Sequence, residues 1–150
     1  MHAYLAGVID IAGHIGIRPR IGYRRLTDGR DMTYYVATIA LSDASPVIPD
    51  LLQAVFPARR SQYKAKNRKQ TEWHMWEADN DGAREPLLLL APYLRLKRRQ
   101  AELALSLIGL IESDAAGSSR PLTAEQEQAR RSLYEEVRAF AAVRPRRVYR

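Results

Sequence analysis

Basic side chains recur at alternate positions in two segments of this sequence, and that spacing suits contact with phosphate. Between residues 14 and 25, isoleucines alternate with Arg18, Arg20 and Arg24. A strand sends successive side chains to opposite faces, so the pattern predicts one apolar face and one basic face. Residues 59–70 hold six more basic residues and no acid. The planar fork of arginine matches phosphate oxygens and guanine edges, so both segments indicate a nucleic-acid partner.

We expect a set of polar residues in and beside these two segments to contact DNA. The set comprises Arg18, Arg20, Arg24, Arg25, Arg30, Arg60, Gln62, Lys64, Lys66, Arg68, Lys69, Gln70, Glu72 and His74. A sheet face without a binding role is expected to carry charges of both signs, so the excess of one sign favours DNA. Alternation along the last strand places Glu72 and His74 toward DNA. The opposite phase places Trp73 and Met75 there, and the sequence leaves both phases open.

The nonamer LAGVIDIAG, residues Leu5 to Gly13, resembles the signature of the LAGLIDADG homing endonucleases. It matches six of the nine positions, and Val8 is a conservative seventh. Residues 92–101 are similar to the segment that enters a later helix in that family. The resemblance covers about residues 2–112. It implies an α-β-β-α-β-β-α half-domain whose four antiparallel strands lie over the major groove of double-stranded DNA.

The resemblance also implies a metal site, from which this sequence departs. In the family, the eighth residue of the nonamer is an acid that binds Mg²⁺ at the scissile phosphate. That position is Ala12 here, and a methyl group cannot ligate a hard cation. Asp10 is the remaining acid of the nonamer and a candidate catalytic residue. A shift of two residues turns a helical side chain by about 200°, however, which counts against recruitment of Asp10 as a ligand.

Two further residues match polar positions of the family's active site. Lys97 corresponds to a basic residue near the reacting phosphate, where it could stabilise developing negative charge. Asp43, at the end of the second predicted strand, lies near a position that orients water. A surface salt bridge is the alternative interpretation of each residue, and the sequence leaves both interpretations open.

Small residues on the first predicted helix indicate close helix packing. Ala3, Ala6 and Gly7 follow helical spacing over residues 3–12, so another backbone can approach that face. Family members with one motif per chain pair through this helix. We therefore expect a homodimer with these three residues at its interface.

The predicted elements give an α+β fold with a four-stranded antiparallel sheet and an extra C-terminal helix. Strands are expected over 14–25, 33–41, 59–66 and 70–78, with helices over 3–12, 45–56, 87–91 and 97–112. Thr123 and Gln126 form a capping box that begins the last helix. The predicted organisation is a DNA-binding and endonuclease domain at 1–112, a linker at 113–122, and a helix with a basic tail at 123–150.

Composition excludes several other classes of protein. Hydrophobic residues make up 46% of the 150, which is too many for a disordered chain, and the longest apolar run is far shorter than a membrane helix. The sequence has no cysteine for disulfides or thiolate metal sites. We expect a cytoplasmic, intracellular location, no membrane partner and no small-molecule substrate. The net charge of +7 agrees with binding to a polyanion.

The resemblance therefore implies a site-specific, metal-dependent DNA endonuclease that is disarmed at Ala12. Two alternatives keep the same fold. One is a DNA-binding regulator that does not cleave, and the other is an intron maturase that assists RNA splicing.

Overall fold

The computed structural model describes residues 1–26, 28–64, 71–115 and 122–142. The elements are α1 (His2–Ala12), β1 (His14–Arg25), β2 (Asp31–Asp43), α2 (Val47–Val55), β3 (Arg59–Lys64), β4 (Glu72–Asp79), α3 (Asp81–Leu90), the 3₁₀ turn η1 (Ala91–Tyr93), α4 (Arg98–Ala115) and α5 (Ala124–Ala142). The predicted α+β class is confirmed. Within the described ranges, no helix is long and apolar enough to cross a membrane.

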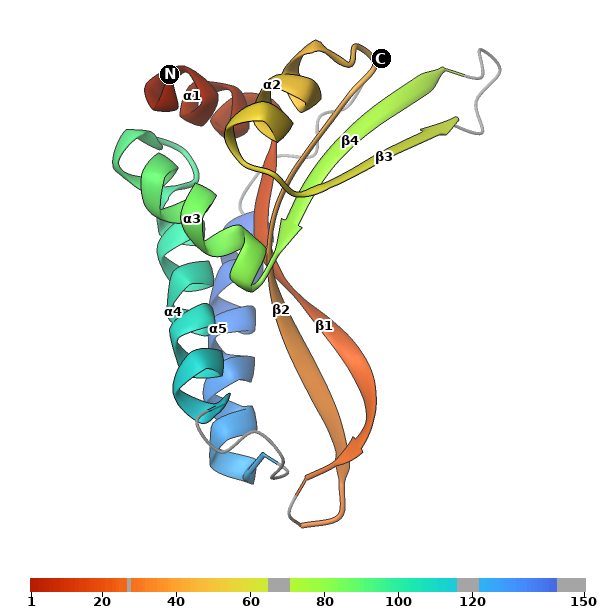
Figure 1. Ribbon diagram of the computed structural model, residues 1–150. Coiled ribbons are helices and arrows are strands. Elements are labelled where there is room, and N and C mark those ends of the chain that lie inside the picture. Colours follow the sequence, from red (N-terminus) through yellow and green to blue (C-terminus); the bar gives the residue numbers. More distant parts are fainter. Residues whose placement is uncertain (27, 65–70, 116–121, 143–150) are drawn as a thin grey trace.

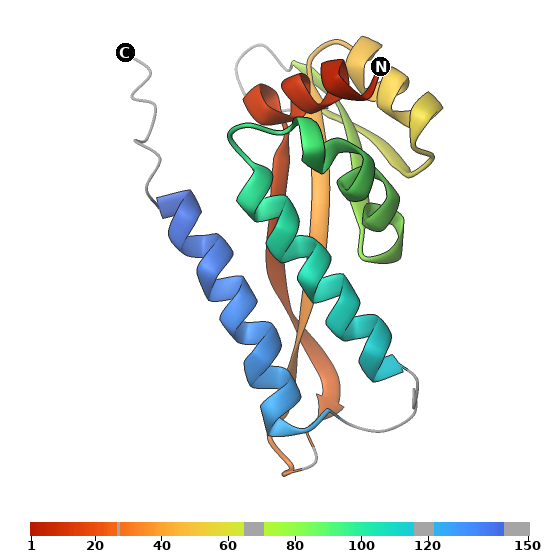
Figure 2. The ribbon, with the colours of Figure 1, turned by 90° about the vertical axis from the view of Figure 1, so that its left-hand side faces the viewer.

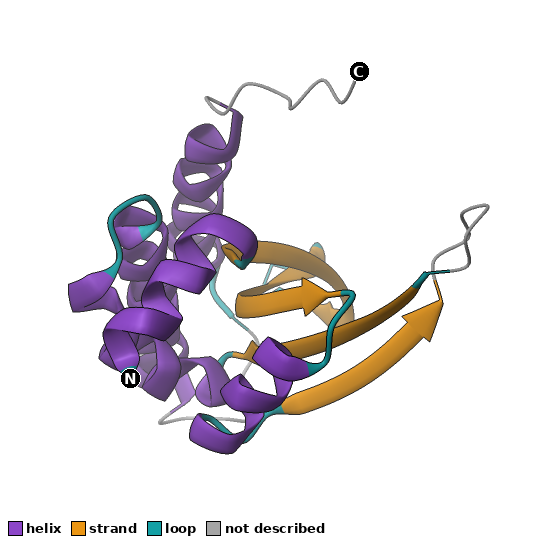
Figure 3. Cartoon of the chain, turned by 90° about the horizontal axis from the view of Figure 1, so that it is seen from above, coloured by secondary structure: helices purple, strands orange, loops and turns teal. Residues whose placement is uncertain are grey.

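The four strands form one antiparallel sheet in the order β1-β2-β4-β3. The helices lie on one side of this curved sheet and leave the other side uncovered (Figures 1 and 3). The two hairpins diverge toward opposite ends of the sheet, with β1 and β2 forming the longer one (Figure 1). This layout gives the molecule one core and one open sheet surface.

The core fills the space between the sheet and the helices. Ile15, Ile39 and Trp76 project from the strands, and they meet Leu5 and Leu107 of α1 and α4 in one buried cluster. Alternating apolar residues on β1 and β2 produce the buried face, as their period of two predicts. Burial of these side chains is the main stabilising contribution to the fold.

Helix α5 belongs to the same core. It lies beside α4 (Figure 2) and contacts α4, β1 and β2. Val137 is buried in the main cluster. The predicted capping box is confirmed, because the Gln126 amide donates to Thr123 Oγ1 at 3.2 Å and the Thr123 amide donates to Gln126 Oε1 at 2.9 Å. The predicted basic tail, residues 143–150, lies outside the described residues.

Helix α3 is longer than predicted, because it begins at Asp81 rather than near Leu87. Asn80 adopts a positive φ of 44°, which asparagine tolerates better than most residues. Its backbone and side chain both bond to Ala37 of β2, while its carbonyl accepts from the amide of Ala83. One residue therefore ends β4 and begins α3.

Candidate functional site

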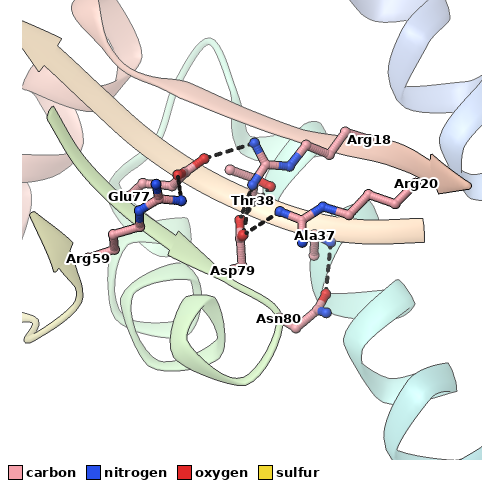
Figure 4. Close-up of polar contacts among 8 residues, drawn as sticks. All are labelled: Arg18, Arg20, Ala37, Thr38, Arg59, Glu77, Asp79 and Asn80. Carbon is pink, nitrogen blue, oxygen red and sulfur yellow. Dashed lines mark hydrogen bonds and ion pairs between the residues drawn. The ribbon is translucent and has the colours of Figure 1, made fainter. Parts of the chain in front are cut away.

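The uncovered sheet face carries a polar cluster drawn from all four strands. Cross-strand register places Arg18 and Arg20 of β1 on this face, as predicted, because Ile15 and Ile17 point to the core. The same register adds Arg59 of β3. The other members are Thr38 of β2 and the acids Glu77 and Asp79 of β4. We call these six residues the central cluster (Figure 4).

Arg18 reaches across β2 to bind both acids of β4. One of its terminal nitrogens lies 2.9 and 2.7 Å from the two carboxylate oxygens of Asp79. The other nitrogen lies 2.9 Å from a Glu77 oxygen. The β2 residues on this path are small, since Thr38 and Ala40 pair with Asp79 and Glu77. Thr38 also donates to Asp79 at 2.9 Å.

The outer arginines of the central cluster share the same two acids. Arg20 lies 3.3 Å from Asp79, and Arg59 lies 3.6 Å from Glu77. Glu77 is only 7% exposed, so its charge needs these partners. The expectation of a face of one charge sign is wrong. The acids occupy alternate positions at the end of β4, which extends to Asp79. Sequence analysis ended this strand at residue 78 and did not consider either acid.

The predicted phase of the last two strands is also wrong. Trp76 and Ala78 are buried in the core, so residues of the same parity on β4 point toward the helices. Four predicted DNA contacts therefore lie on the helix side of the sheet: Gln62, Lys64, Glu72 and His74. Trp73 and Met75, which alternate with Glu72 and His74 along β4, lie on the uncovered face. This is the alternative phase that the sequence left open.

Arg60 also projects to the helix side. Its guanidinium binds Asp50 of α2 and donates to the Met75 carbonyl at 3.0 Å. Arg60 therefore ties α2 to β3 and β4, which is a structural task rather than the predicted contact with DNA. Burial of the large aromatic residue Trp76 sets this phase. The prediction from the sequence was based instead on the polar residues of the hairpin.

The remaining predicted contacts are described only in part. Lys66, Arg68, Lys69 and Gln70 lie outside the described residues. Arg24 and Arg25 belong to β1 by their backbone. Arg30 is exposed near the far end of the first hairpin, where it pairs with Asp28 at 2.8 Å. Their role in DNA binding stays a prediction.

Asp10 closes the junction between α1 and the segment that leads into α4. Its carboxylate accepts the backbone amides of Arg95 at 2.6 Å, Leu96 at 3.2 Å and Lys97 at 3.0 Å. The side chain is buried. Both oxygens are therefore engaged, and the three amides use three of the roughly four acceptor sites of this buried carboxylate.

Lys97 lies at the other side of the same junction. Its buried ammonium group donates to the carbonyl oxygens of Ile9 and Asp10, at the C-terminal end of α1. A cation at this position offsets the negative end of the helix dipole. Asp43 instead accepts the Ser45 amide at 2.8 Å, in the turn before α2. The structure thus brings Asp10 and Lys97 together and gives Asp43 a local turn contact.

Ala12 is exposed at the last position of α1. The residues around it do not fit a divalent cation, because Ala12 offers no ligand and Asp10 is engaged. No group of three acids, histidines or cysteines within the described ranges is placed to hold a metal. The described residues near Ala12 therefore do not supply the acid ligand that the resemblance implies at this position.

The outer surface of α1 differs from the predicted interface. Ala6 is fully buried within its own chain, so its predicted place at a dimer contact is wrong. Ala3 is exposed and Gly7 is partly exposed, and both remain available to a partner. Sequence analysis missed Tyr4 and Ile11, whose side chains are exposed on this helix. Burial against η1 and α3 decided which face of α1 points outward.

A cavity of about 240 Å³ lies between the start of β1 and helices α4 and α5. His14 lines it beside Lys97. The pKa of His14 is lowered because the ring is partly shielded from water, and because Lys97 and Arg18 repel its charged form. The ring rests against Gly16, where a Cβ would lie only 2.8 Å from His14 Nε2. His14 therefore favours its neutral form.

Structural comparison identifies the architecture. The chain is similar to the homing endonuclease I-CvuI in complex with the I-CreI target, with a TM-score of 0.71 and 19% identity over 97% of this chain and 84% of that one. The fold is that of homing endonucleases. The archaeal intron-encoded homing endonuclease I-Vdi141I, complexed with DNA, has a TM-score of 0.70 at 11% identity, over 97% of this chain and 87% of the other.

A third similar structure is longer than this chain and matches it over less than half of its own length. The LAGLIDADG homing endonuclease I-GzeII, in complex with its DNA target, has a TM-score of 0.62 at 11% identity, covering 97% of this chain and 45% of that chain. A share of 97% takes in α5, which the sequence resemblance left outside. No family model and no curated protein sequence matches this chain.

Proposed function

We propose that this protein binds double-stranded DNA site-specifically through the uncovered sheet face. In this proposal it acts as a homodimer joined along α1, in the manner of a homing endonuclease that has lost its metal ligand. The fold supports the binding mode, because the similar structures I-Vdi141I and I-GzeII are complexes with DNA. The nonamer supports the pairing through α1.

The sheet face suits the major groove in shape and chemistry. A two-stranded antiparallel ribbon fits that groove, where arginine reads guanine. Arg20 and Arg59 project from opposite outer strands of the sheet. Partly exposed Trp73 and Met75 add apolar surface for contact with thymine methyl groups.

Ala12 is the observation that separates binding from cleavage. Its methyl group occupies the exposed end of α1 at the position that the resemblance assigns to the metal-binding acid. Metal-assisted hydrolysis needs a bound cation to activate water and to stabilise charge on phosphate. With the neighbouring Asp10 engaged by backbone amides, this chain binds its site without cutting it.

The test begins with a binding site that the parent protein selects from a random duplex library. The parent, Ala12→Asp and the neutral control Ala12→Asn are then incubated with that DNA, with Mg²⁺ and with a chelator. We expect cutting of both strands by Ala12→Asp with Mg²⁺ alone. The Asn variant matches Asp in size but lacks the charge, so it should leave the DNA intact.

Each other outcome has a defined meaning. Metal-dependent cutting by the parent would show that another group replaces the lost ligand, and the proposed loss of cleavage would be wrong. Failure of every variant to cut would show that more than one carboxylate has been lost, which favours a DNA-binding regulator. A parent that selects no DNA sequence would refute the proposed function.

A further inference from the structure

We propose that Asp79 and Glu77 determine DNA specificity as positioning residues, by holding Arg20 and Arg59 as the guanine readers of this face. Arg18 is then the internal bridge of the central cluster rather than a DNA contact. The inference rests on the proposed function and assigns particular tasks within it.

The carboxylate of Asp79 has no hydrogen-bond acceptor site left for a nucleobase. A carboxylate offers about four acceptor sites on its two oxygens. Oδ1 accepts from Arg18 and Thr38 at 2.9 Å each, while Oδ2 accepts from Arg18 at 2.7 Å and from Arg20 at 3.3 Å. Asp79 is therefore saturated with protein donors, although it lies on the open face. Its role is to orient the groups that surround it.

Arg18 is committed in the same way. Its two terminal nitrogens bind Asp79 and Glu77, and its Nε is buried without a hydrogen-bond partner among the described residues. Turning this guanidinium toward DNA would break three short contacts and leave two carboxylates without their shared cation. We infer that Arg18 stays in place when DNA binds.

Arg20 and Arg59 form the outer ends of the central cluster. Their side chains are 55% and 69% exposed. Each arginine contacts a carboxylate through one terminal nitrogen, and more than half of each side chain is open to solvent. Guanine N7 and O6 accept two parallel donors from such a fork. A carboxylate that fixes the side chain beforehand reduces the entropy lost when the base is bound.

The acids also reduce the attraction to DNA that does not depend on sequence. Three arginines and two acids leave the five charged members of the central cluster with a net charge of only +1. Attraction to phosphate is independent of sequence and grows with each cation that the backbone can reach. Removing Asp79 should therefore strengthen binding to unrelated DNA while it weakens recognition of guanine.

The variant Asp79→Asn tests both effects. Its dissociation constants are measured for the parent's selected site and for a scrambled duplex, over a range of salt concentrations. We expect the ratio between the two constants to fall about tenfold, which is typical for the loss of one base contact. Binding to the scrambled duplex should tighten and become more salt-dependent. A fresh selection should lose guanine at the position that Arg20 reads.

Two further variants separate positioning from general effects. Glu135→Gln makes the same charge change on the exposed side of α5, so it should shift both constants together and leave their ratio unchanged. Arg20→Ala should lose guanine at the same base position as Asp79→Asn. If Asp79 acts through Arg20, adding Asp79→Asn to Arg20→Ala should change the discrimination no further.

The proposal is overturned if Asp79→Asn or Arg20→Ala selects the same bases as the parent, or if their effects on discrimination add. Arg20 is an exposed residue, so its variant tests the proposal even if Asp79→Asn fails to fold. Neither result would contradict the proposed function, because the parent protein would still select a DNA sequence. A parent without sequence preference would refute the proposed function itself.

Discussion

Replacing Asp10 by Asn should destabilise the protein strongly, although the two side chains have nearly the same size. The carboxylate accepts three amides, from Arg95 and Leu96 on one oxygen and from Lys97 on the other. Asparagine has one oxygen and one NH₂ group. Its oxygen can keep the first two amides, but its NH₂ then faces the buried Lys97 amide, donor against donor.

The magnitude follows from these contacts. A buried amide without an acceptor costs about 1–3 kcal/mol, and the two remaining bonds weaken by roughly 0.5–1 kcal/mol each when the acceptor loses its charge. The expected loss in free energy of unfolding is about 2–5 kcal/mol. For a chain of 150 residues, that corresponds to a melting temperature lower by about 4–20 °C.

Thermal unfolding followed by circular dichroism measures this loss. The matched control is Asp81→Asn, an exposed position in the first turn of α3, which should cost less than about 1 kcal/mol. If Asp10→Asn had the same melting temperature as the parent protein, the structural role of Asp10 would be refuted. If Mg²⁺ raised the melting temperature of the parent but not of Asp10→Asn, Asp10 would instead be a metal ligand.

Three other predictions concern the dimer, the pH dependence and the salt dependence. An added Cβ at Gly7 meets nothing within 4 Å in its own chain, so Gly7→Leu should leave the monomer folded and break the dimer; light scattering that finds a monomeric parent with intact DNA affinity would contradict this. Because the pKa of His14 is lowered in the folded state, the unfolded state binds the proton more readily. Stability should therefore fall as the pH drops below 6.5, and urea unfolding of His14→Gln should lack this component. Neutralising Lys66 and Arg68 together should flatten the slope of log K against log salt by about 0.9 for each phosphate that the variant no longer binds, and an unchanged slope would show that these two residues do not bind phosphate.

Local rules predicted much of the fold from particular residues. Isoleucines at alternate positions predicted β1 and its buried face, and Thr123 with Gln126 predicted the start of α5. The strand and the helix start were predicted because each depends on neighbours a few residues apart, where period and capping operate. The architecture followed from the resemblance of the nonamer to a family signature and not from a local rule.

The site was predictable only where one strand decided the outcome. Arg18 and Arg20 alternate with core isoleucines, so their face followed from β1 alone. On β3 and β4 the polar and apolar residues permit two phases, and a shift of one residue moves every side chain to the other face. Packing of Trp76 between the sheet and Phe56 chose the phase, which no local pattern contains.

The sequence by itself determined most of the helices and strands, the two hairpins and the absence of a carboxylate at position 12. Tertiary structure alone decided that Asp10 serves the amides of residues 95–97, and that Ala6 faces inward. It also decided that the terminal nitrogens of Arg18 bind two acids that lie 59 and 61 residues away in the chain. Such contacts depend on how strands and helices pack at long range, because side chains distant in the sequence meet only after the sheet has formed.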